Sequence, residues 1–431
     1  MKPPFRHTLL LFAATACGDR PAGEDSPLLH ATVRDSADVR IIENPRPPTG
    51  TRLDWRIGSE PEVTIGEVEG AEPYLLARVS DALVLADGRI VVANGGSHEL
   101  RVFDASGYHV ATWGRRGEGP GEFTNLSQVH RWPGDSLLAL YSQARHLSVL
   151  DSSGNFGRSF TLQRGWAFFT VESVSATGAI LSSDFVRPGN RPVGFSRLPS
   201  HYRVRGPEGE TRSSLGSFPG PEMFAVRTAR GLSGGGIPFR HRVSAFAWGD
   251  FAAVAQNDTY EIRAFDLDGT LRRIVRRDHE LVAPTPAHLD AYIEDRVAVH
   301  PEEERPERRA ELRESMRDRH VPETHPAYAA AQSDLVDHLW VREYALPGGG
   351  DPNPVWTVFD PEGQVLGFME TPAGLSILEI GDDYILGLAR DDLGVEYVQV
   401  WSLRAVGAVN WGVHPLTREN VNHSFQLVIC D

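Results

Sequence analysis

The sequence predicts an all-β fold built from one unit of four strands that is repeated six times, and three observations support this. Apolar and polar residues alternate with a period of two over short runs along most of the chain. Polar, Gly-rich turns such as DASG, DSSG, DLDG and DPEG separate many of these runs. The order of strand, turn and strand also recurs along the chain, so the repeat governs the fold class.

The last two strands of the unit are the clearest part of the repeat. ELRVFDASGYHVATWG begins at Glu99, and EIRAFDLDGTLRRIV begins at Glu261. Further copies begin at His146, His201, Val355 and, without the turn, Tyr397. Another strand precedes each copy, as in RIVVAN from Arg89, and a further candidate precedes that one. Units of four strands that repeat radially are the blades of a β-propeller.

The sixth unit lacks its outermost strand, and the start of the chain supplies one. The run VTIGEVEGAEPYLL from Val63 mirrors ATWGRRGEGPGEFTNL from Ala111. A strand from this run would complete the last blade and leave no long open edge. We therefore expect a six-bladed β-propeller over residues 51–403, closed by an N-terminal strand.

Gly114–Phe123, GRRGEGPGEF, joins two blades in this scheme, and its glycines permit a tight reversal of the chain. With Val91–Asn94 (VVAN) and Arg101–Asp104 (RVFD), this junction resembles the NHL-type six-bladed propellers. Residues 321–344 are similar to a segment of a group of bacterial six-bladed propeller lipoproteins. The resemblance implies the fold and no particular activity.

The first residues have the layout of a secretory signal. Lys2 and Arg6 precede an apolar run from Leu9 to Ala16, which is too short to span a bilayer. The sequence ATAC, which ends at Cys17, resembles a bacterial lipobox, and this resemblance implies cleavage after residue 16 and a diacylated Cys17. A plain secreted protein, or a cytoplasmic one with an apolar start, is the alternative. We expect a lipid-anchored protein of the bacterial cell envelope that faces the periplasm or the exterior.

Two segments lie outside the predicted blades. Residues 17–50 are rich in proline, glycine and charge, so we expect a flexible tether there. Residues 404–431 fit no blade, and Cys430 in this tail has no evident mate.

One face of the predicted ring carries the long insertions. In a propeller, the loops between second and third strands share a face with the junctions between blades. Three such insertions are at residues 184–200, 218–241 and 345–354, and the largest is a helical insert at 284–331 between blades 4 and 5. Because loops on a rigid scaffold carry function, we place any binding site on this face, which we call the loop-bearing face.

The candidate binding residues are four charged side chains on this face near the mouth of the channel, Arg115, Arg116, Glu118 and Glu122, together with Arg342, whose side chain would point into the channel. The alternative is that they are solvated or paired with neighbours, and that Arg342 forms a structural pair with an adjacent blade. The net charge of −15 disfavours sequence-independent nucleic-acid binding.

No catalytic or metal motif stands out. GEGPGEF lacks the Lys-Ser/Thr of a phosphate-binding P-loop, and no G-x-S-x-G elbow is present. His320 and His325 lack a third ligand nearby, so we assign no metal site.

The sequence therefore favours a monomeric, membrane-tethered binding module that recognises a protein or a glycan and needs no cofactor. The alternative is a hydrolase or lactonase-like enzyme that holds a divalent cation, such as calcium, on the ring axis. Asn94, Asn257, Glu122 and Asp334 are residues of the kind that it would need. A sensor of small metabolites is a third and weaker option.

Overall fold

The structure is a computed structural model that describes residues 30–141, 146–162, 168–185, 192–228, 231–317, 319–350 and 353–405. The predicted signal peptide (residues 1–16), Cys17 and Cys430 lie outside these ranges, so those predictions stay untested.

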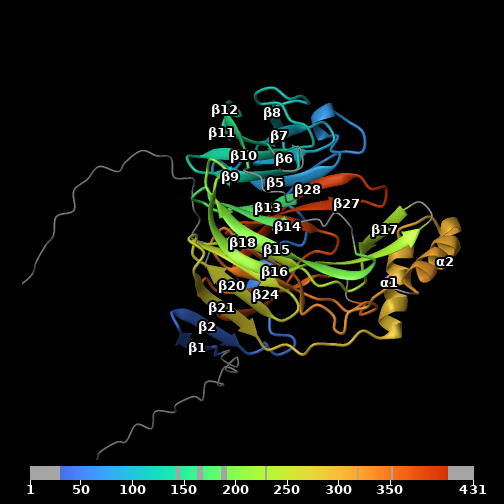
Figure 1. The fold of residues 1–431 in the computed structure, drawn as a ribbon. Coiled ribbons are helices and arrows are strands. Elements are labelled where there is room, and N and C mark those ends of the chain that lie inside the picture. The colour runs from blue at the N-terminus through green and yellow to red at the C-terminus, as the bar shows by residue number, and fades with distance from the viewer. Residues whose placement is uncertain are drawn as a thin grey trace, which may run out of the picture.

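The described strands form six sheets, and three of them have four strands each in sequence order (Figure 1). One of these sheets contains β5 (Val79–Val84), β6 (Ile90–Asn94), β7 (Glu99–Phe103) and β8 (His109–Trp113). The next contains β9 (Gln128–Trp132), β10 (Ser136–Tyr141), β11 (His146–Asp151) and β12 (Phe156–Thr161). The third contains β22 (Tyr328–Ser333), β23 (Leu339–Glu343), β24 (Val355–Phe359) and β25 (Val365–Glu370). Within each of these sheets, neighbouring strands are antiparallel, as the short turns of the sequence predict.

The other three sheets are larger. One contains β13 (Phe168–Val174), β14 (Ile180–Phe185), β15 (Gly194–Arg205), β16 (Thr211–Thr228) and β17 (Gly231–Gly236). Another contains β18 (Val243–Trp248), β19 (Phe251–Gln256), β20 (Glu261–Phe265) and β21 (Leu271–Arg277), and β2 (Val39–Asn44) and β1 (Thr32–Ser36) extend its edge. The last contains β26 (Ser376–Ile380), β27 (Tyr384–Arg390) and β28 (Glu396–Ala405), joined by β3 (Trp55–Ile57) and β4 (Val63–Ile65).

One strand of each sheet lies nearest the centre of the molecule, and we call it the first strand of that sheet; these strands are β5, β9, β13, β18, β22 and β26. Each first strand is hydrogen-bonded to the first strand of the next sheet or to the turn that follows it. Val129 N–H donates to Asp81 Oδ2, Gln128 Nε2 to Val171 O, and Ala247 N–H to Ser173 Oγ. Ser333 Oγ donates to Ala247 O, Leu335 N–H to Ile380 O, and Val84 N–H to Glu379 Oε1. The fold is therefore all-β and propeller-like.

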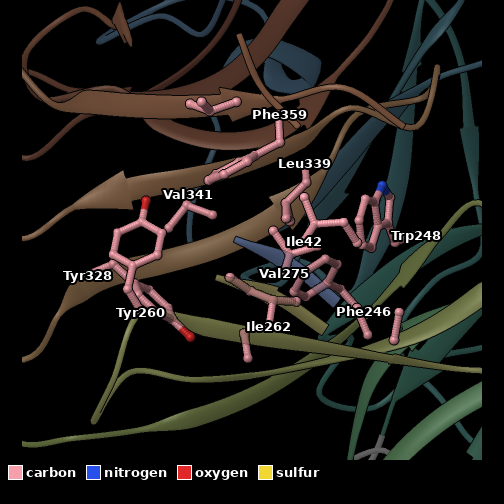
Figure 2. Close-up of a cluster of buried hydrophobic side chains, with 14 of the residues drawn as sticks. Ile42, Phe246, Trp248, Tyr260, Ile262, Val275, Tyr328, Leu339, Val341 and Phe359 are labelled. Carbon is pink, nitrogen blue, oxygen red and sulfur yellow. The ribbon is translucent and has the colours of Figure 1, made fainter. Parts of the chain in front are cut away.

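Each sheet is held to the next by apolar side chains. Figure 2 shows the cluster between the β18–β21 sheet and the β22–β25 sheet, where Trp248, Leu339 and Phe359 meet. Trp248 is 1% exposed and Phe359 is 0% exposed. The alternation of the strands puts these residues on the faces between sheets, where each buried large side chain contributes about 1.5–3 kcal/mol.

Part of the segment that the sequence predicts as a tether, residues 17–50, forms strands. β1 and β2 form a hairpin, and β2 runs parallel to β21 and places Ile42 in the core of Figure 2. Asn44 donates to Arg276 O and Gly363 O, and so joins two neighbouring sheets. The apolar pair Ile41 and Ile42 explains why this segment forms a strand. Both side chains are buried where β2 pairs with β21, and the proline and glycine residues lie outside the strand.

After this hairpin the chain follows the outer edges of two further sheets. Leu53 N–H donates to Phe368 O on β25, and β3 and β4 then pair antiparallel with β28. The outer position beside β28 is thus filled by strands from the start of the chain, at the place where the sequence predicts one. We call residues 39–65 the N-terminal strap.

The junction Gly114–Phe123 turns back on itself, with Arg116 and Phe123 in a parallel bridge. Gly114 has φ +74, and a Cβ there would lie 2.3 Å from the Phe123 ring. Phe123 is fully buried between two sheets. Glycine is needed at 114 because the chain must pass in a left-handed conformation against an aromatic ring.

The insertions at 184–200 and 218–241 were expected to be loops, and in part they are strands. Gly194–Arg197 of β15 pairs with Glu222–Ala225 of β16, and β17 adds a further strand. The register shift between Arg197 and Pro199 explains how prolines fit, because a bulge tolerates a residue without an N–H group. The insertion therefore extends the sheet toward the helices (Figure 1).

The insert between β21 and β22 contains α1 (Pro286–Ala298) and α2 (Arg305–Met316), with η2 (Glu302–Glu304) between them; η1 (Glu72–Tyr74) precedes β5. The two helices are as the sequence predicts, but β22 begins at Tyr328, so the last residues of the expected insert belong to a sheet. Within the described ranges, no helix has the length and apolar character that a membrane span requires.

Candidate functional site

At the Gly114–Phe123 junction, the predicted charged side chains Arg115 and Glu122 bond to residues of the junction itself. Arg115 forms an ion pair with Glu122 at 2.7 Å, and Glu122 also accepts from Gly119 N–H at 2.9 Å. These bonds lower the pKa of the Glu122 carboxyl group. The bonds of Arg115 and Glu122 match the alternative that these charges pair with neighbours.

Arg342 lies elsewhere, in a cavity of about 520 Å³ on the loop-bearing face. Its walls come from the chain between β17 and β18, the end of β19, α1, the end of α2, and the end of β23. The cavity is thus built where the insert meets two neighbouring sheets.

The lining of this cavity, which we call the arginine cavity, carries charge of one sign. Five arginines line it: Arg240, Arg242, Arg296, Arg319 and Arg342. Among the described lining residues, none is an aspartate or a glutamate. A concave site with one sign of charge raises the local concentration of the opposite ion. This is a local reversal of charge in a chain whose net charge is −15.

Three of these arginines have free side chains. Within the described residues, the guanidinium groups of Arg240, Arg242 and Arg342 form no hydrogen bond or ion pair. Partial desolvation in the cavity, together with the charges of Arg240 and Arg342, lowers the pKa of Arg242. Desolvation also lowers the pKa of Arg342. All three keep their charge at neutral pH, because arginine does not lose its proton in proteins.

The other two arginines help to build the walls. Arg319 donates from Nη1 to Gly236 O at 3.0 Å, which ties the end of α2 to β17. The guanidinium of Arg296 lies 4.9 Å from the centre of the Tyr292 ring. Their charges remain in the cavity while their contacts fix its shape.

Backbone contacts position Arg242. The buried Asn257, at the end of β19, accepts from Arg242 N–H at 2.7 Å and donates to Tyr328 O at 3.0 Å. It therefore holds the chain before β18 against the start of β22. This role differs from the metal ligand that the enzyme alternative would need.

Helix α1 is held in place by capping and by apolar contacts. Thr285 accepts from His288 N–H in a capping box, and the His288 ring accepts from Thr285 N–H. Two apolar side chains of α1, Ile293 and Val297, are buried. The His325 ring bonds to His288 at 2.8 Å between Nε2 and Nδ1, so the start of α1 is joined to the segment before β22.

A buried ionic cluster supports the cavity wall from behind. His241, between Arg240 and Arg242, donates its N–H to Glu222 at 2.8 Å, and Arg197 forms two hydrogen bonds to Asp258 at 2.8 and 2.9 Å. Burial raises the pKa of Glu222, but the contacts from His241 and Arg197 outweigh it and lower that pKa overall.

In the described ranges, one group of side chains has ligand atoms close enough to share a metal ion, all within 4.8 Å of one another; it consists of Glu222, His241 and Asp258. The arrangement does not fit a cation, because the Arg197 guanidinium already binds the carboxylate of Asp258 and lies 3.7 Å from Glu222. We read it as a structural ion cluster.

The residues considered for the enzyme alternative each have a structural role. Asn94 accepts from Ala77 N–H and donates to Ser97 Oγ. Asp334 accepts from two backbone N–H groups, from His338 and from Trp340 Nε1 at 3.0 Å. Neither Glu122 nor Asp334 is in the group described above.

The space on the axis is a second cavity of about 380 Å³, lined by the first strands of all six sheets. Its charges are mainly acidic. Arg131 pairs there with Glu379. Burial raises the pKa of Asp81 to about 7, despite hydrogen bonds from Val129 and Ala82. We assign no ligand to this cavity.

The sequence indicates Arg342 as a candidate and does not indicate the other four arginines of the cavity. Arg240 and Arg242 flank the buried His241, Arg296 is in a helix, and Arg319 follows another helix. They share no local motif. The available signal was the arginine content of the predicted insert, which includes Arg296 and Arg319.

Comparisons with known proteins give structural likeness only. No family model and no curated protein matches the chain. A putative exported protein of Bacteroides fragilis is 10% identical with a TM-score of 0.46, over 85% of this chain and 99% of its own. A member of the DUF4221 family from Bacteroides vulgatus is 10% identical with a TM-score of 0.45, over 81% and 99%. Virginiamycin B lyase from Staphylococcus aureus is 9% identical with a TM-score of 0.34, over 81% and 99%.

Proposed function

We propose that this chain is a membrane-tethered binding module of the bacterial cell envelope, which recognises an anionic group of a protein or glycan partner through the arginine cavity. The observation that carries the proposal is the set of three free guanidinium groups in a cavity whose described lining includes no carboxylate. Guanidinium groups bind carboxylates and phosphates through paired hydrogen bonds, and binding of this kind needs no metal.

The proposed scaffold is a closed, six-bladed β-propeller of the NHL-like kind. Support comes from the six sheets, from the hydrogen bonds that join their first strands, and from the pairing of β3 and β4 with β28. A closed ring would hold the walls of the cavity rigidly, because they belong to different sheets. Rigid walls reduce the entropy lost when a ligand binds.

The proposed anchor is a lipid on Cys17, and the residues between Cys17 and Thr32 would link it to the propeller. Its test is incorporation of labelled palmitate in a bacterial host. We expect label in the native chain and none in the Cys17→Ser variant. Equal labelling of both proteins would refute the anchor without touching the arginine cavity.

The binding site is tested by replacing two of its free arginines. We expect Arg242→Gln with Arg342→Gln to abolish retention on an immobilised anionic polysaccharide. Arg212→Gln with Arg263→Gln is the matched control, because it removes the same two charges from side chains that are about half exposed and paired with Glu210 and Glu261. Retention of the native chain should fall as salt rises from 0.05 to 0.5 M, since screening shortens the Debye length from roughly 14 to 4 Å. Equal retention of the double variant and the native chain would overturn the proposed site.

A further inference from the structure

We infer that the group bound in the arginine cavity is a phosphate monoester carried by a sugar. This inference rests on the proposed function and names the chemical class of its ligand. It depends on the balance of charge, on the origin of the guanidinium groups and on the uncharged groups that line the cavity.

The charge of the cavity favours a dianion. Arg240, Arg242 and Arg342 are free, and the pKa of Arg242 is lowered in part by the other two, so the three cations repel one another in the empty cavity. A single carboxylate or a sulfate ester carries one negative charge and would leave two of these cations unmatched. A phosphate monoester carries about −1.5 to −2 at pH 7, which comes closer to balancing them.

The geometry of the donors favours a group with several equivalent oxygens. The three free guanidinium groups come from two different segments, the chain before β18 and the end of β23. Donors that converge from separate segments can reach separate oxygens of one acceptor. A phosphate monoester offers three terminal oxygens, whereas a carboxylate offers two in one plane.

The rest of the lining suits a sugar. Tyr292 and Tyr344 line the cavity, are half-buried, and have hydroxyl groups that form no hydrogen bond with the described residues. Burial raises the pKa of Tyr344 to about 12, so its hydroxyl group stays neutral and can donate. Neutral hydroxyl groups beside a cluster of cations match a molecule that has hydroxyl groups next to a phosphate.

The shape of the cavity favours a sugar over a phosphorylated peptide. Its volume of about 520 Å³ is within the usual range for a small-molecule site. Its walls are the insert helices and the ends of β17 and β23, and an extended peptide would instead need a long groove. A sugar phosphate can enter as a free metabolite or as the end of a phosphorylated glycan.

Calorimetric titration of the folded chain at constant ionic strength tests the class of ligand. The probes are glucose 6-phosphate, glucose 6-sulfate, glucuronate, glucose, inorganic phosphate and a short phosphoserine peptide. We expect glucose 6-phosphate to bind at least tenfold more tightly than any other probe. Its affinity should fall several-fold from pH 7.5 to pH 5.5, because the second pKa of a phosphate monoester is about 6. A mannan bearing terminal phosphate, tested beside free glucose 6-phosphate, distinguishes a glycan end from a metabolite by which of them binds more tightly.

Two variants link the result to the cavity. Arg242→Gln should weaken glucose 6-phosphate at least tenfold, while Arg212→Gln should bind as the native chain does. Tyr344→Phe removes one hydroxyl group and should weaken glucose 6-phosphate several-fold without weakening inorganic phosphate. A merely structural role for Tyr344 would weaken both probes equally.

The outcomes separate this inference from the proposed function. Equal or tighter binding of glucose 6-sulfate or glucuronate at the same arginines would overturn the phosphate class and leave an anion site. Tighter binding of the phosphoserine peptide, or equal binding of inorganic phosphate, would overturn the sugar. Absence of binding by every anion would overturn both proposals.

Discussion

Arg242 shows how a single side chain is held for binding at some cost to the empty protein. Its backbone N–H donates to Asn257, the charges of Arg240 and Arg342 act on its guanidinium, and no carboxylate is among the described lining residues. Nearby like charges destabilise a folded chain, so this arrangement is expected where a ligand of opposite charge completes it.

We therefore expect Arg242→Gln to stabilise the ligand-free protein. Like-charge neighbours at the surface cost a few tenths of a kcal/mol each, and removing one cation relieves two such contacts. The melting temperature at low salt should rise by about 1 °C, and the rise should vanish in 0.5 M salt, where the charges are screened. A lower melting temperature at low salt would mean that Arg242 has a structural partner.

Asp334 shows the opposite case, a polar residue whose role is structural. Its carboxylate is buried and accepts from the backbone N–H groups of Val336 and His338, and from Trp340 Nε1. Asp104 has the same two backbone contacts in another turn but no contact with a tryptophan.

Asp334→Ala should therefore cost more stability than Asp104→Ala. The additional cost is about 2 kcal/mol, because Trp340 Nε1 is left buried without an acceptor. Chemical denaturation of the two variants and the native chain measures the difference. If Asp334→Ala instead abolished tight binding of calcium and left stability unchanged, the metal-enzyme alternative would regain its support.

At the scale of elements, the insert is the part of the fold that positions the arginine cavity. The sequence predicted a helical insert between two units of the repeat, and α1 and α2 lie there. It could not show that α1 docks through His288 and His325, because those residues are 37 positions apart in the chain. The extension of β15–β17 was also unpredicted, since its prolines and glycines favour loops in a sequence reading.

The histidine contact makes the docking of α1 sensitive to acid. Burial, and then the neighbouring His288 and His241, lower the pKa of His325 to about 4 from its usual value of 6.5. Tyr344, which packs against His325, stays neutral at these pH values, because burial raises the pKa of its hydroxyl group to about 12. The stability contributed by neutral His325 is complete above pH 6.5 and is lost as the pH falls toward 4.

We expect the amides of α1 to exchange faster with solvent deuterium at pH 5 than at pH 7, after correction for the intrinsic rates. His325→Phe keeps an aromatic ring against Phe239 and cannot be protonated, so its α1 exchange should be independent of pH over this range. Equal pH dependence in the native chain and the variant would exclude His325 as the cause.

At the scale of the whole molecule, the N-terminal strap ties three sheets together. It pairs with β21, bonds to Phe368 on β25 and then pairs with β28. The sequence predicted the final pairing from the missing strand of the last unit. It did not reveal β1 and β2, because a composition rich in proline and charge hid the short apolar pair Ile41 and Ile42.

Truncation tests the strap. Removal of residues 18–30 should leave the melting temperature unchanged. Removal of residues 18–45 takes away Ile42 and the hydrogen bonds of Asn44, and leaves the edge of β21 open. The loss of buried apolar area alone is worth about 2 kcal/mol or more, and an open edge promotes aggregation. Equal melting temperatures and solubility for both truncations would show that β2 adds nothing to the fold.

The central claim is that the arginine cavity binds an anionic group, and a crystal structure of residues 18–431 soaked with glucose 6-phosphate tests it most directly. We predict phosphate density between the guanidinium groups of Arg242 and Arg342, at hydrogen-bonding distance from both. An empty arginine cavity at a saturating concentration of the sugar phosphate, or density at another place on the molecule, would contradict the claim.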